Sequence, residues 1–210
     1  MIDARLRERV TVDKQQFGFM PNRSTIDTIF ALRQLTEKYR DGQENLQCVF
    51  IDLEKTYDRV PREELWACMR EAKITEGHVK AVQDMYKGCR TKVRTPCGET
   101  EEYSRDQRLA LSFSWSYWLT KDIRREAPWD MLFADDVVIC TKTRQEAERR
   151  LESWRHALER RGLKVSRKKT EYLCIDGGEK EEGSIRIQGE VVNRVKDFKY
   201  LEATVQWSGV

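Results

Sequence analysis

The sequence lacks the features that would suit a membrane, an oxidising compartment or a zinc site. No apolar stretch approaches the roughly 18 residues that a helix needs to cross a bilayer. The first residues, Met1 to Arg7, have no hydrophobic signal core. The six cysteines include no Cys-x-x-Cys pair, and the chain has only two histidines. We therefore expect reduced intracellular thiols, no zinc site and no membrane partner.

An excess of charge of one sign is also missing. The 210 residues include 39 lysines and arginines against 36 acids, a net charge of +3. This charge is a weak pointer to nucleic acid and is far below the excess of a dedicated basic arm. A hydrophobic share of 39% fits one globular domain with a lean core. Basic residues do gather between 144 and 161 and again at 167–169. A solvated helix face is the ordinary explanation for such runs, and phosphate contact is the alternative.

Two adjacent acids, Asp135 and Asp136, lie between two apolar, β-prone runs at 131–133 and 137–140. This pattern predicts a hairpin with carboxylates at its tip. Two such carboxylates are unfavourable unless a cation balances them, and a divalent metal is the natural partner. A plain polar turn is the competing interpretation, because Asp favours turns.

A third acid, Asp52, ends another apolar run at 48–51. An acid that breaks a hydrophobic pattern marks a place where function is expected. The chain between Asp52 and Asp135 is long enough for helices to return the second strand beside the first, so the two acids are candidate co-ligands of one metal centre. An acid that merely caps a strand end is the structural alternative.

Five stretches, in chain order, resemble the reverse transcriptase domain of non-LTR (LINE-type) retrotransposons. They are 16–21 with 23–25 on the fingers side, 50–61 (motif A), 133–136 (motif C), 162–171 (motif D) and 198–201 (motif E). Five motifs in family order are far more specific than any one of them. The resemblance runs from about Val12 to about Trp207.

The resemblance implies an α+β fold, the palm of a right-hand polymerase, in which a small antiparallel sheet packs on helices. Part of the fingers would be present, as a fingers-side segment at about 12–48. The palm core would span about 49–175 and the motif E hairpin region about 184–207. A thumb is absent from this stretch of sequence.

The resemblance also implies RNA-directed DNA synthesis on an RNA template with a DNA primer. Deoxynucleoside triphosphates would be added to the primer 3′-hydroxyl with two Mg²⁺ ions, or Mn²⁺ in their place. The metal ligands would be Asp52 and Asp135, with Asp136 as a catalytic neighbour. Lys169 resembles the motif D lysine that protonates pyrophosphate, although Lys168 beside it is an open choice and a solvated basic cluster is the alternative.

Three further residues are expected at the incoming nucleotide: Tyr57, Arg23 and Gln107. Tyr57 stands where the family places an aromatic ring beneath the sugar, and ordinary core packing is an equal alternative. The family resemblance implies a nuclear or cytoplasmic protein, and it leaves the oligomeric state open.

Motif B departs from the family pattern, which is approximately Gln-Gly-Ser-x-Leu-Ser-Pro. Here residues 107–113 read Gln-Arg-Leu-Ala-Leu-Ser-Phe. Arg108 replaces a glycine that allows close backbone approach and dihedrals that arginine disfavours. Glu202 also replaces the usual glycine of motif E. The Glu202 change is not decisive. The altered motif B, with the expected lack of the first fingers strands and of a thumb, predicts that the chain alone is inactive. The alternative to an enzyme is then a retrotransposon remnant with weak nucleic-acid binding.

Local signals predict four helices, a hairpin and a final strand. The first helix begins at Ser24 and Asp27 and has four apolar residues on roughly one side: Ile26, Ile29, Phe30 and Leu35. The second begins at Pro61 and runs through Leu65, Trp66 and Met69, and the third contains Val79, Val82 and Tyr86. The fourth begins with a capping box at 143–146, ends at Gly162 and has Ala147, Leu151, Trp154 and Leu158 at helical spacing. A hairpin is expected around Gln188-Gly189, and one strand from Phe198 to Val205.

Overall fold

The computed structural model describes residues 17–18, 23–54, 62–87, 94–95, 98–99, 122–125, 129–133, 136–175, 183–201 and 203–206. Within these ranges, no helix is both long and apolar enough to span a membrane.

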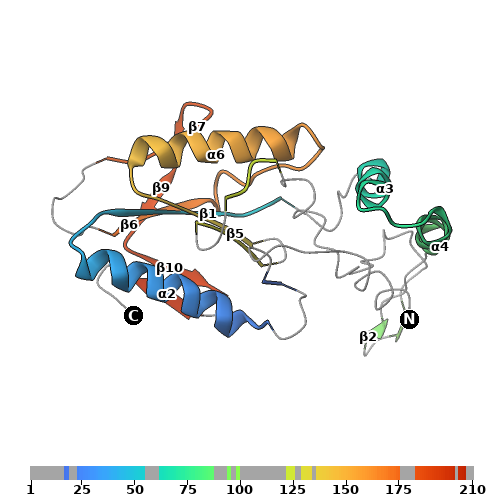
Figure 1. Cartoon of the computed structure of the whole chain (residues 1–210), viewed down its shortest axis with the longest axis horizontal. Helices are drawn as coiled ribbons and strands as arrows, with labels where there is room; N and C mark the ends of the chain where they lie inside the picture. The colour runs from blue at the N-terminus through green and yellow to red at the C-terminus, as the bar shows by residue number, and fades with distance from the viewer. Residues whose placement is uncertain are drawn as a thin grey trace.

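A five-stranded sheet forms the centre of the molecule (Figure 1). Its strands, in spatial order, are β4 (Asp130–Phe133), β5 (Asp136–Thr141), β1 (Leu46–Ile51), β6 (Glu171–Ile175) and β9 (Asn193–Val195). Every neighbouring pair is antiparallel except β6 with β9, which is parallel. This arrangement confirms the predicted fold class, a small, mostly antiparallel sheet packed on helices.

Alternation along each strand divides the side chains between two cores. On β1, Val49 and Ile51 face one core, whereas Cys48 and Phe50 face the other. The first core is completed by helix α6 (Arg144–Glu159), and the second by helix α2 (Thr25–Asp41) together with the hairpin β10–β11. Figure 1 shows α6 on one side of the sheet and α2 with β10 on the other.

Helix α6 confirms the N-cap and the apolar periodicity expected from the sequence, whereas only the Thr143 half of the predicted capping box is formed. Its N-cap Thr143 accepts a hydrogen bond from the Glu146 amide through its side chain. The four predicted apolar positions are fully buried: Ala147, Leu151, Trp154 and Leu158. The Glu146 carboxylate bonds to Arg125, 2.6 Å away, and so links the helix to a distant segment.

Helix α2 begins where predicted, with a complete capping box between Ser24 and Asp27. The predicted buried face was wrong at Ile26 and Phe30, which are 72% and 56% exposed, whereas Leu35 is buried as predicted. The other buried residues of the helix are Thr28, Leu32, Thr36 and Tyr39. The two threonines can be buried because their hydroxyls bond to backbone carbonyls of the same helix.

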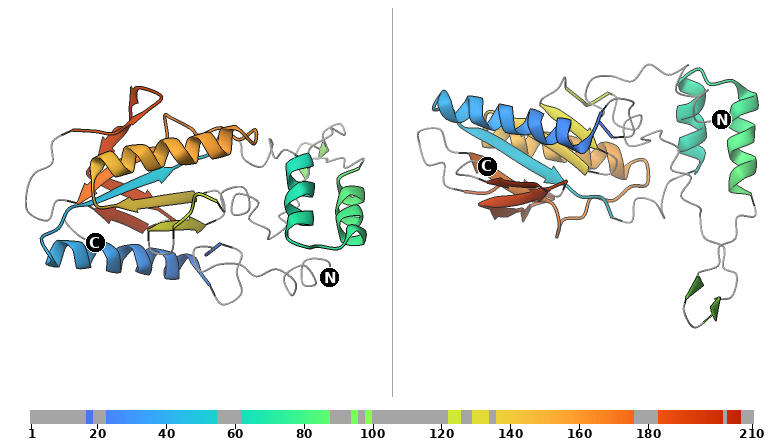
Figure 2. Two further views of the ribbon diagram at one scale, coloured as in Figure 1. Left: turned by 45° about the horizontal axis from the view of Figure 1, so that its top comes forward. Right: turned by 90° about the horizontal axis from the view of Figure 1, so that it is seen from below.

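Helices α3 (Arg62–Glu71) and α4 (Glu76–Tyr86) form a separate pair, confirming the second and third predicted helices. Their apolar faces share a third core that contains Leu65, Met69, Val79 and Val82. The pair lies to one side of the central sheet in both views of Figure 2.

Four short hairpin strands complete the C-terminal part. Strands β7 (Arg186–Ile187) and β8 (Glu190–Val191) form the hairpin predicted around Gln188-Gly189. The single strand expected after Phe198 was wrong: β10 (Asp197–Tyr200) pairs with β11 (Ala203–Gln206) as a second hairpin. The chain turns at Leu201, whose φ is +49°, a left-handed conformation for which the sequence contains no signal.

A further small hairpin, earlier in the chain, joins β2 (Arg94–Thr95) and β3 (Gly98–Glu99).

Candidate active site

The acids Asp52 and Asp136 lie at the same end of two neighbouring strands. Strand β1 pairs with β5 so that Ile51 faces Val137. One step further along this register sets Asp52 opposite Asp136. By the alternation of the two strands, both side chains belong to the face that carries Phe50 and Val138. The fold therefore brings motif A and motif C together, as the sequence predicted.

Backbone bonds attach motif D to the end of β1. Leu53 and Val165 form an isolated antiparallel bridge. The Ser166 amide donates to the Asp52 carbonyl at 2.8 Å, and the Glu54 amide donates to the Lys164 carbonyl at 2.8 Å. The turn that follows Ser166 is thereby held beside the carboxylate of Asp52.

This attachment brings a lysine to the motif A acid. Lys169 Nζ lies 3.6 Å from Asp52 Oδ2, and the side chains are 72% and 35% exposed. Such an exposed pair contributes little to stability. Its importance is positional, because an ammonium group stands beside the carboxylate that was predicted to be catalytic.

A cavity of about 360 Å³ unites residues from four of the five sequence motifs. Its described lining comprises Phe50, Ile51, Asp52, Asp136, Val137, Lys168, Lys169, Glu171, Phe198, Lys199 and Tyr200. Carboxylates and ammonium groups thus share one space whose other wall is aromatic. A pocket of this composition suits a ligand that carries both phosphate oxygens and metal cations.

The aromatic wall comes from the hairpin β10–β11 packing on β1. The rings of Phe50 and Phe198 stack with centroids 3.8 Å apart, and Tyr200 lies 5.8 Å from Phe50. Burial, and then the negative charge of Asp136, raise the pKa of Tyr200 above its usual value. The phenol is therefore protonated at neutral pH and available as a hydrogen-bond donor.

The oxygen donors present fit a divalent cation. Asp52 and Asp136 offer hard carboxylate oxygens from two different strands to one cavity, which is the ligand type that Mg²⁺ and Mn²⁺ prefer. Among the described residues, no group of three or more His, Cys, Asp or Glu side chains is close enough together to hold a metal ion. Asp135, the second predicted metal ligand, lies outside those residues.

Arg23 is the one predicted nucleotide-binding residue that the structure describes, and it is not part of the described lining of this cavity. The Arg23 guanidinium lies over the ring of Phe17, 4.9 Å from its centroid. Phe17 in turn bonds through its amide to the Leu132 carbonyl on the edge strand β4. Tyr57 and Gln107 lie outside the described residues, as does the altered motif B at 107–113.

Sequence reasoning missed a buried ionic network at the start of β4. The side chain of Asp130 is fully buried and forms an ion pair with Arg150 of α6. The Arg125 amide also donates to Asp130 at 2.6 Å, and its guanidinium bonds to the Cys140 carbonyl. Burial raises the pKa of Asp130 even though Arg150 opposes the shift. No local signal could have found this network, because its members are separated by 15 residues or more along the chain, apart from the 125–130 contact.

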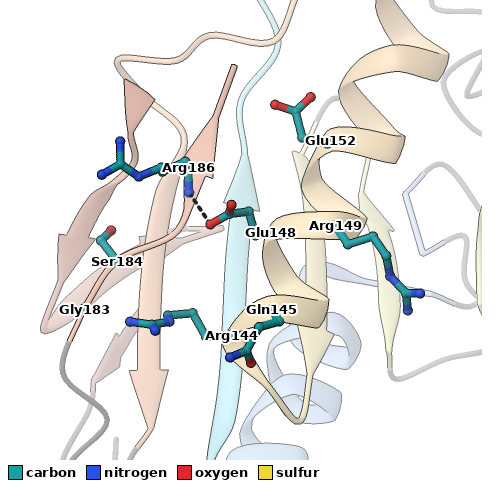
Figure 3. Close-up of a pocket in the computed structure, with 8 residues that line it drawn as sticks. All are labelled: Arg144, Gln145, Glu148, Arg149, Glu152, Gly183, Ser184 and Arg186. Atoms are coloured by element: carbon teal, nitrogen blue, oxygen red, sulfur yellow. Dashed lines mark hydrogen bonds between the residues drawn. The ribbon is translucent and has the colours of Figure 1, made fainter. Parts of the chain in front are cut away.

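A second hollow, of about 650 Å³, lies between the start of α6 and the β7–β8 hairpin (Figure 3). The Arg186 amide donates to Glu148 Oε2 at 2.9 Å, as the dashed line shows, and the Gln188 amide donates to Glu152. These hydrogen bonds hold the β7–β8 hairpin against helix α6. The described lining of this hollow contains none of the predicted catalytic residues.

Comparison with known proteins agrees with this geometry. The family model described as reverse transcriptase (RNA-dependent DNA polymerase) matches residues 1–205. A search of curated proteins found no match. A telomerase structure from Candida tropicalis, in complex with a TWJ fragment of telomeric RNA, is similar in fold, with a TM-score of 0.57 and 14% identity. The match covers 91% of this chain and 35% of the telomerase chain, so the present chain spans about a third of that protein.

Proposed function

We propose that this chain, which belongs to the reverse transcriptase (RNA-dependent DNA polymerase) family, forms the catalytic palm of an RNA-directed DNA polymerase of the LINE type. The reaction adds deoxynucleotides to the 3′-hydroxyl of a DNA primer on an RNA template. The observation that carries the proposal is the cavity that Asp52, Asp136, Lys169 and Tyr200 line together. Residues from four separate motifs converge there, from strands β1, β5 and β10 and the turn before β6.

Asp52 and Asp135 are the proposed ligands of two Mg²⁺ ions, with Mn²⁺ as a substitute, and Asp136 supports them. When bound, such ions lower the pKa of the attacking hydroxyl and neutralise charge on the leaving pyrophosphate. Support for this assignment comes from the carboxylates of Asp52 and Asp136 on one cavity wall. The position of Asp52 is fixed by the pairing of β1 on both sides and by the Ser166 bond to its carbonyl.

Lys169 is the proposed donor of a proton to the leaving pyrophosphate. Its ammonium group lies beside Asp52 and faces the same cavity, so it can reach a phosphate oxygen held there. Proton donation by a positioned side chain typically contributes about 10²–10⁴-fold to a rate. Tyr57, Arg23 and Gln107 remain the proposed contacts to the incoming nucleotide.

The proposal is tested by primer extension on an oligo(dT)-primed poly(rA) template, first with Mg²⁺ and then with Mn²⁺. The wild-type chain is compared with its Asp52→Asn and Asp135→Asn variants, and with Asp41→Asn as a control at the exposed end of α2. We expect incorporation by the wild type and by Asp41→Asn, and its loss in the other two variants.

Folded protein that incorporates no nucleotide with either metal would overturn the polymerase assignment for this chain. The altered motif B at 107–113 is the sequence feature that favours this outcome. RNA binding without synthesis, measured by fluorescence anisotropy on the same template, would then identify the chain as a catalytically inactive remnant.

A further inference from the structure

The hydroxyl of Tyr200 is a buried donor at the catalytic cavity. The side chain is 2% exposed, and its Oη has no hydrogen-bond partner among the residues that the structure describes. A buried hydroxyl without a partner is unfavourable, so such groups in native proteins nearly always have an acceptor. The hydroxyl of Tyr200 therefore needs a hydrogen-bond acceptor at this cavity.

The ring of Tyr200 is held firmly enough to aim that hydroxyl. Phe50 and Phe198 flank it with centroids 5.8 Å and 6.5 Å away. The backbone of Tyr200 pairs with Ala203 across the β10–β11 hairpin. The ring therefore occupies a fixed place on the aromatic wall, opposite the charged groups of the cavity.

The charged groups of the cavity narrow the choice of acceptor. Ammonium groups cannot accept a hydrogen bond, which removes Lys168, Lys169 and Lys199. Of the described carboxylates, Asp52 faces Lys169, and Glu171 accepts from the Asn193 amide at 3.0 Å. Asp136 lies with Asp52 on the face of the sheet on which Tyr200 packs, and it lines the same cavity as Tyr200.

The electrostatics of the phenol agree with this choice. Asp136 is the carboxylate whose negative charge acts on Tyr200, where it raises the pKa of the phenol after burial has already done so. A protonated phenol beside a carboxylate can act as the donor in a charge-assisted hydrogen bond, which is stronger than a neutral one.

We propose that Tyr200 is a positioning residue whose hydroxyl donates a hydrogen bond to the carboxylate of Asp136, directly or through one bridging water. The bond fixes the orientation of Asp136 beside Asp52 at the ends of β5 and β1. The consequence for catalysis rests on the proposed polymerase function, whereas the hydrogen bond itself does not.

The hydrogen bond is tested by NMR on the full chain with ¹³Cζ-labelled tyrosine, because the Cζ shift responds to hydrogen bonding of the hydroxyl. The chain has seven tyrosines, and Tyr200→Phe identifies the Tyr200 signal by its loss. Asp136→Asn removes the acceptor charge, and Asp197→Asn is the control, an exposed acid on the same strand β10. Asp136→Glu, which displaces the carboxylate, serves the same purpose should the asparagine variant fail to fold.

We expect the Tyr200 signal to move in Asp136→Asn and in Asp136→Glu and to stay in place in Asp197→Asn. An unmoved signal in a folded Asp136 variant would overturn the proposal. This readout needs neither metal nor turnover, so it can succeed even if the chain does not polymerise.

A kinetic readout separates positioning from substrate contact. Tyr200→Phe keeps the aromatic packing and removes only the hydroxyl. We expect its kcat in primer extension to fall about tenfold, with the KM for the deoxynucleotide and for primer–template unchanged. A higher KM for primer–template with kcat unchanged would show that the hydroxyl serves nucleic acid instead, and would overturn the proposal.

Discussion

Lys169 Nζ lies 3.6 Å from Asp52 Oδ2 because the chain segments that carry them are joined by backbone hydrogen bonds. The neighbouring Lys168 lines the same cavity. The sequence left the choice between the two lysines open, and the geometry favours Lys169 because its ammonium group stands beside the carboxylate of Asp52, the proposed metal ligand.

We expect Lys169→Met to lower kcat in primer extension by about 100-fold, the lower range for loss of a positioned proton donor. Lys168→Met should cause a smaller loss, about tenfold or less. Lys196→Met, an exposed lysine outside the cavity lining, is the control and should match the wild type. Equal losses in the first two variants would contradict the assignment to Lys169.

Arg150→Met should destabilise the fold strongly, because it leaves the carboxylate of Asp130 buried without its guanidinium. Removing one partner of a buried ion pair costs about 3–5 kcal/mol in the free energy of unfolding. Urea denaturation followed by circular dichroism measures this loss. Arg33→Ala is the matched control, since it breaks the exposed pair with Glu37 and should cost about 0.5 kcal/mol or less. A loss in Arg150→Met no larger than in this control would show that the buried pair contributes nothing.

The same carboxylate gives a pH dependence with a defined sign. Burial raises the pKa of Asp130 above its ordinary 3.8, so the folded state binds this proton more tightly than the unfolded state does. Its stabilising contribution is complete below pH 3.8 and is lost as the pH rises through the raised pKa. We expect the free energy of unfolding of the wild type, relative to Asp130→Asn, to fall across this window in urea titrations at successive pH values. A relative stability that rises with pH would contradict a raised pKa of Asp130 in the folded state.

Phe198→Ala should loosen the β10–β11 hairpin from the central sheet. The ring stacks on Phe50 at 3.8 Å and is half-buried, so we expect a loss of about 2–3 kcal/mol in the free energy of unfolding. Thr204→Ala, at an exposed position on the partner strand β11, should change it by less than about 0.5 kcal/mol. Primer extension should fall along with stability, because the same hairpin supplies Tyr200 and Lys199 to the cavity. Full activity with an undisturbed unfolding curve would show that the stack is dispensable.

The elements that could be predicted are those whose signals are local. The N-cap Thr143 and the apolar spacing of α6 are signals within one helix. The apolar runs of β1 and β5 are local too, and each lies next to the acid that marks its end. The sequence also predicted that the motif A and motif C strands lie in one sheet, and the pairing of β1 with β5 confirms this. The predicted partner of Asp52, Asp135, lies outside the described residues. Motif reasoning also named Lys169, which lies at the cavity.

The elements that could not be predicted depend on tertiary contacts or on unusual backbone. The buried face of α2 includes Thr28 and Thr36 rather than the more apolar Ile26 and Phe30, because the sheet and the β10–β11 hairpin decide which side is covered. Leu201 adopts a positive φ without a glycine or asparagine to signal it, so the sequence predicts one strand where the structure has a hairpin. The pairing of Asp130 with Arg150 joins residues 20 positions apart, beyond any periodic pattern.

The alternation of β1 gives the two surfaces of the sheet different tolerance to change. Val49 and Ile51 belong to the core under α6, and Ile51 also lines the cavity. Phe50 and Asp52 belong to the opposite face, where the cavity opens. Volume-conserving substitutions at Val49 can therefore adjust stability without altering the described lining of the cavity. On the opposite surface the same strand has no such freedom. A register shift of one residue would turn Asp52 away from the cavity and toward α6, although the composition of the chain would be unchanged.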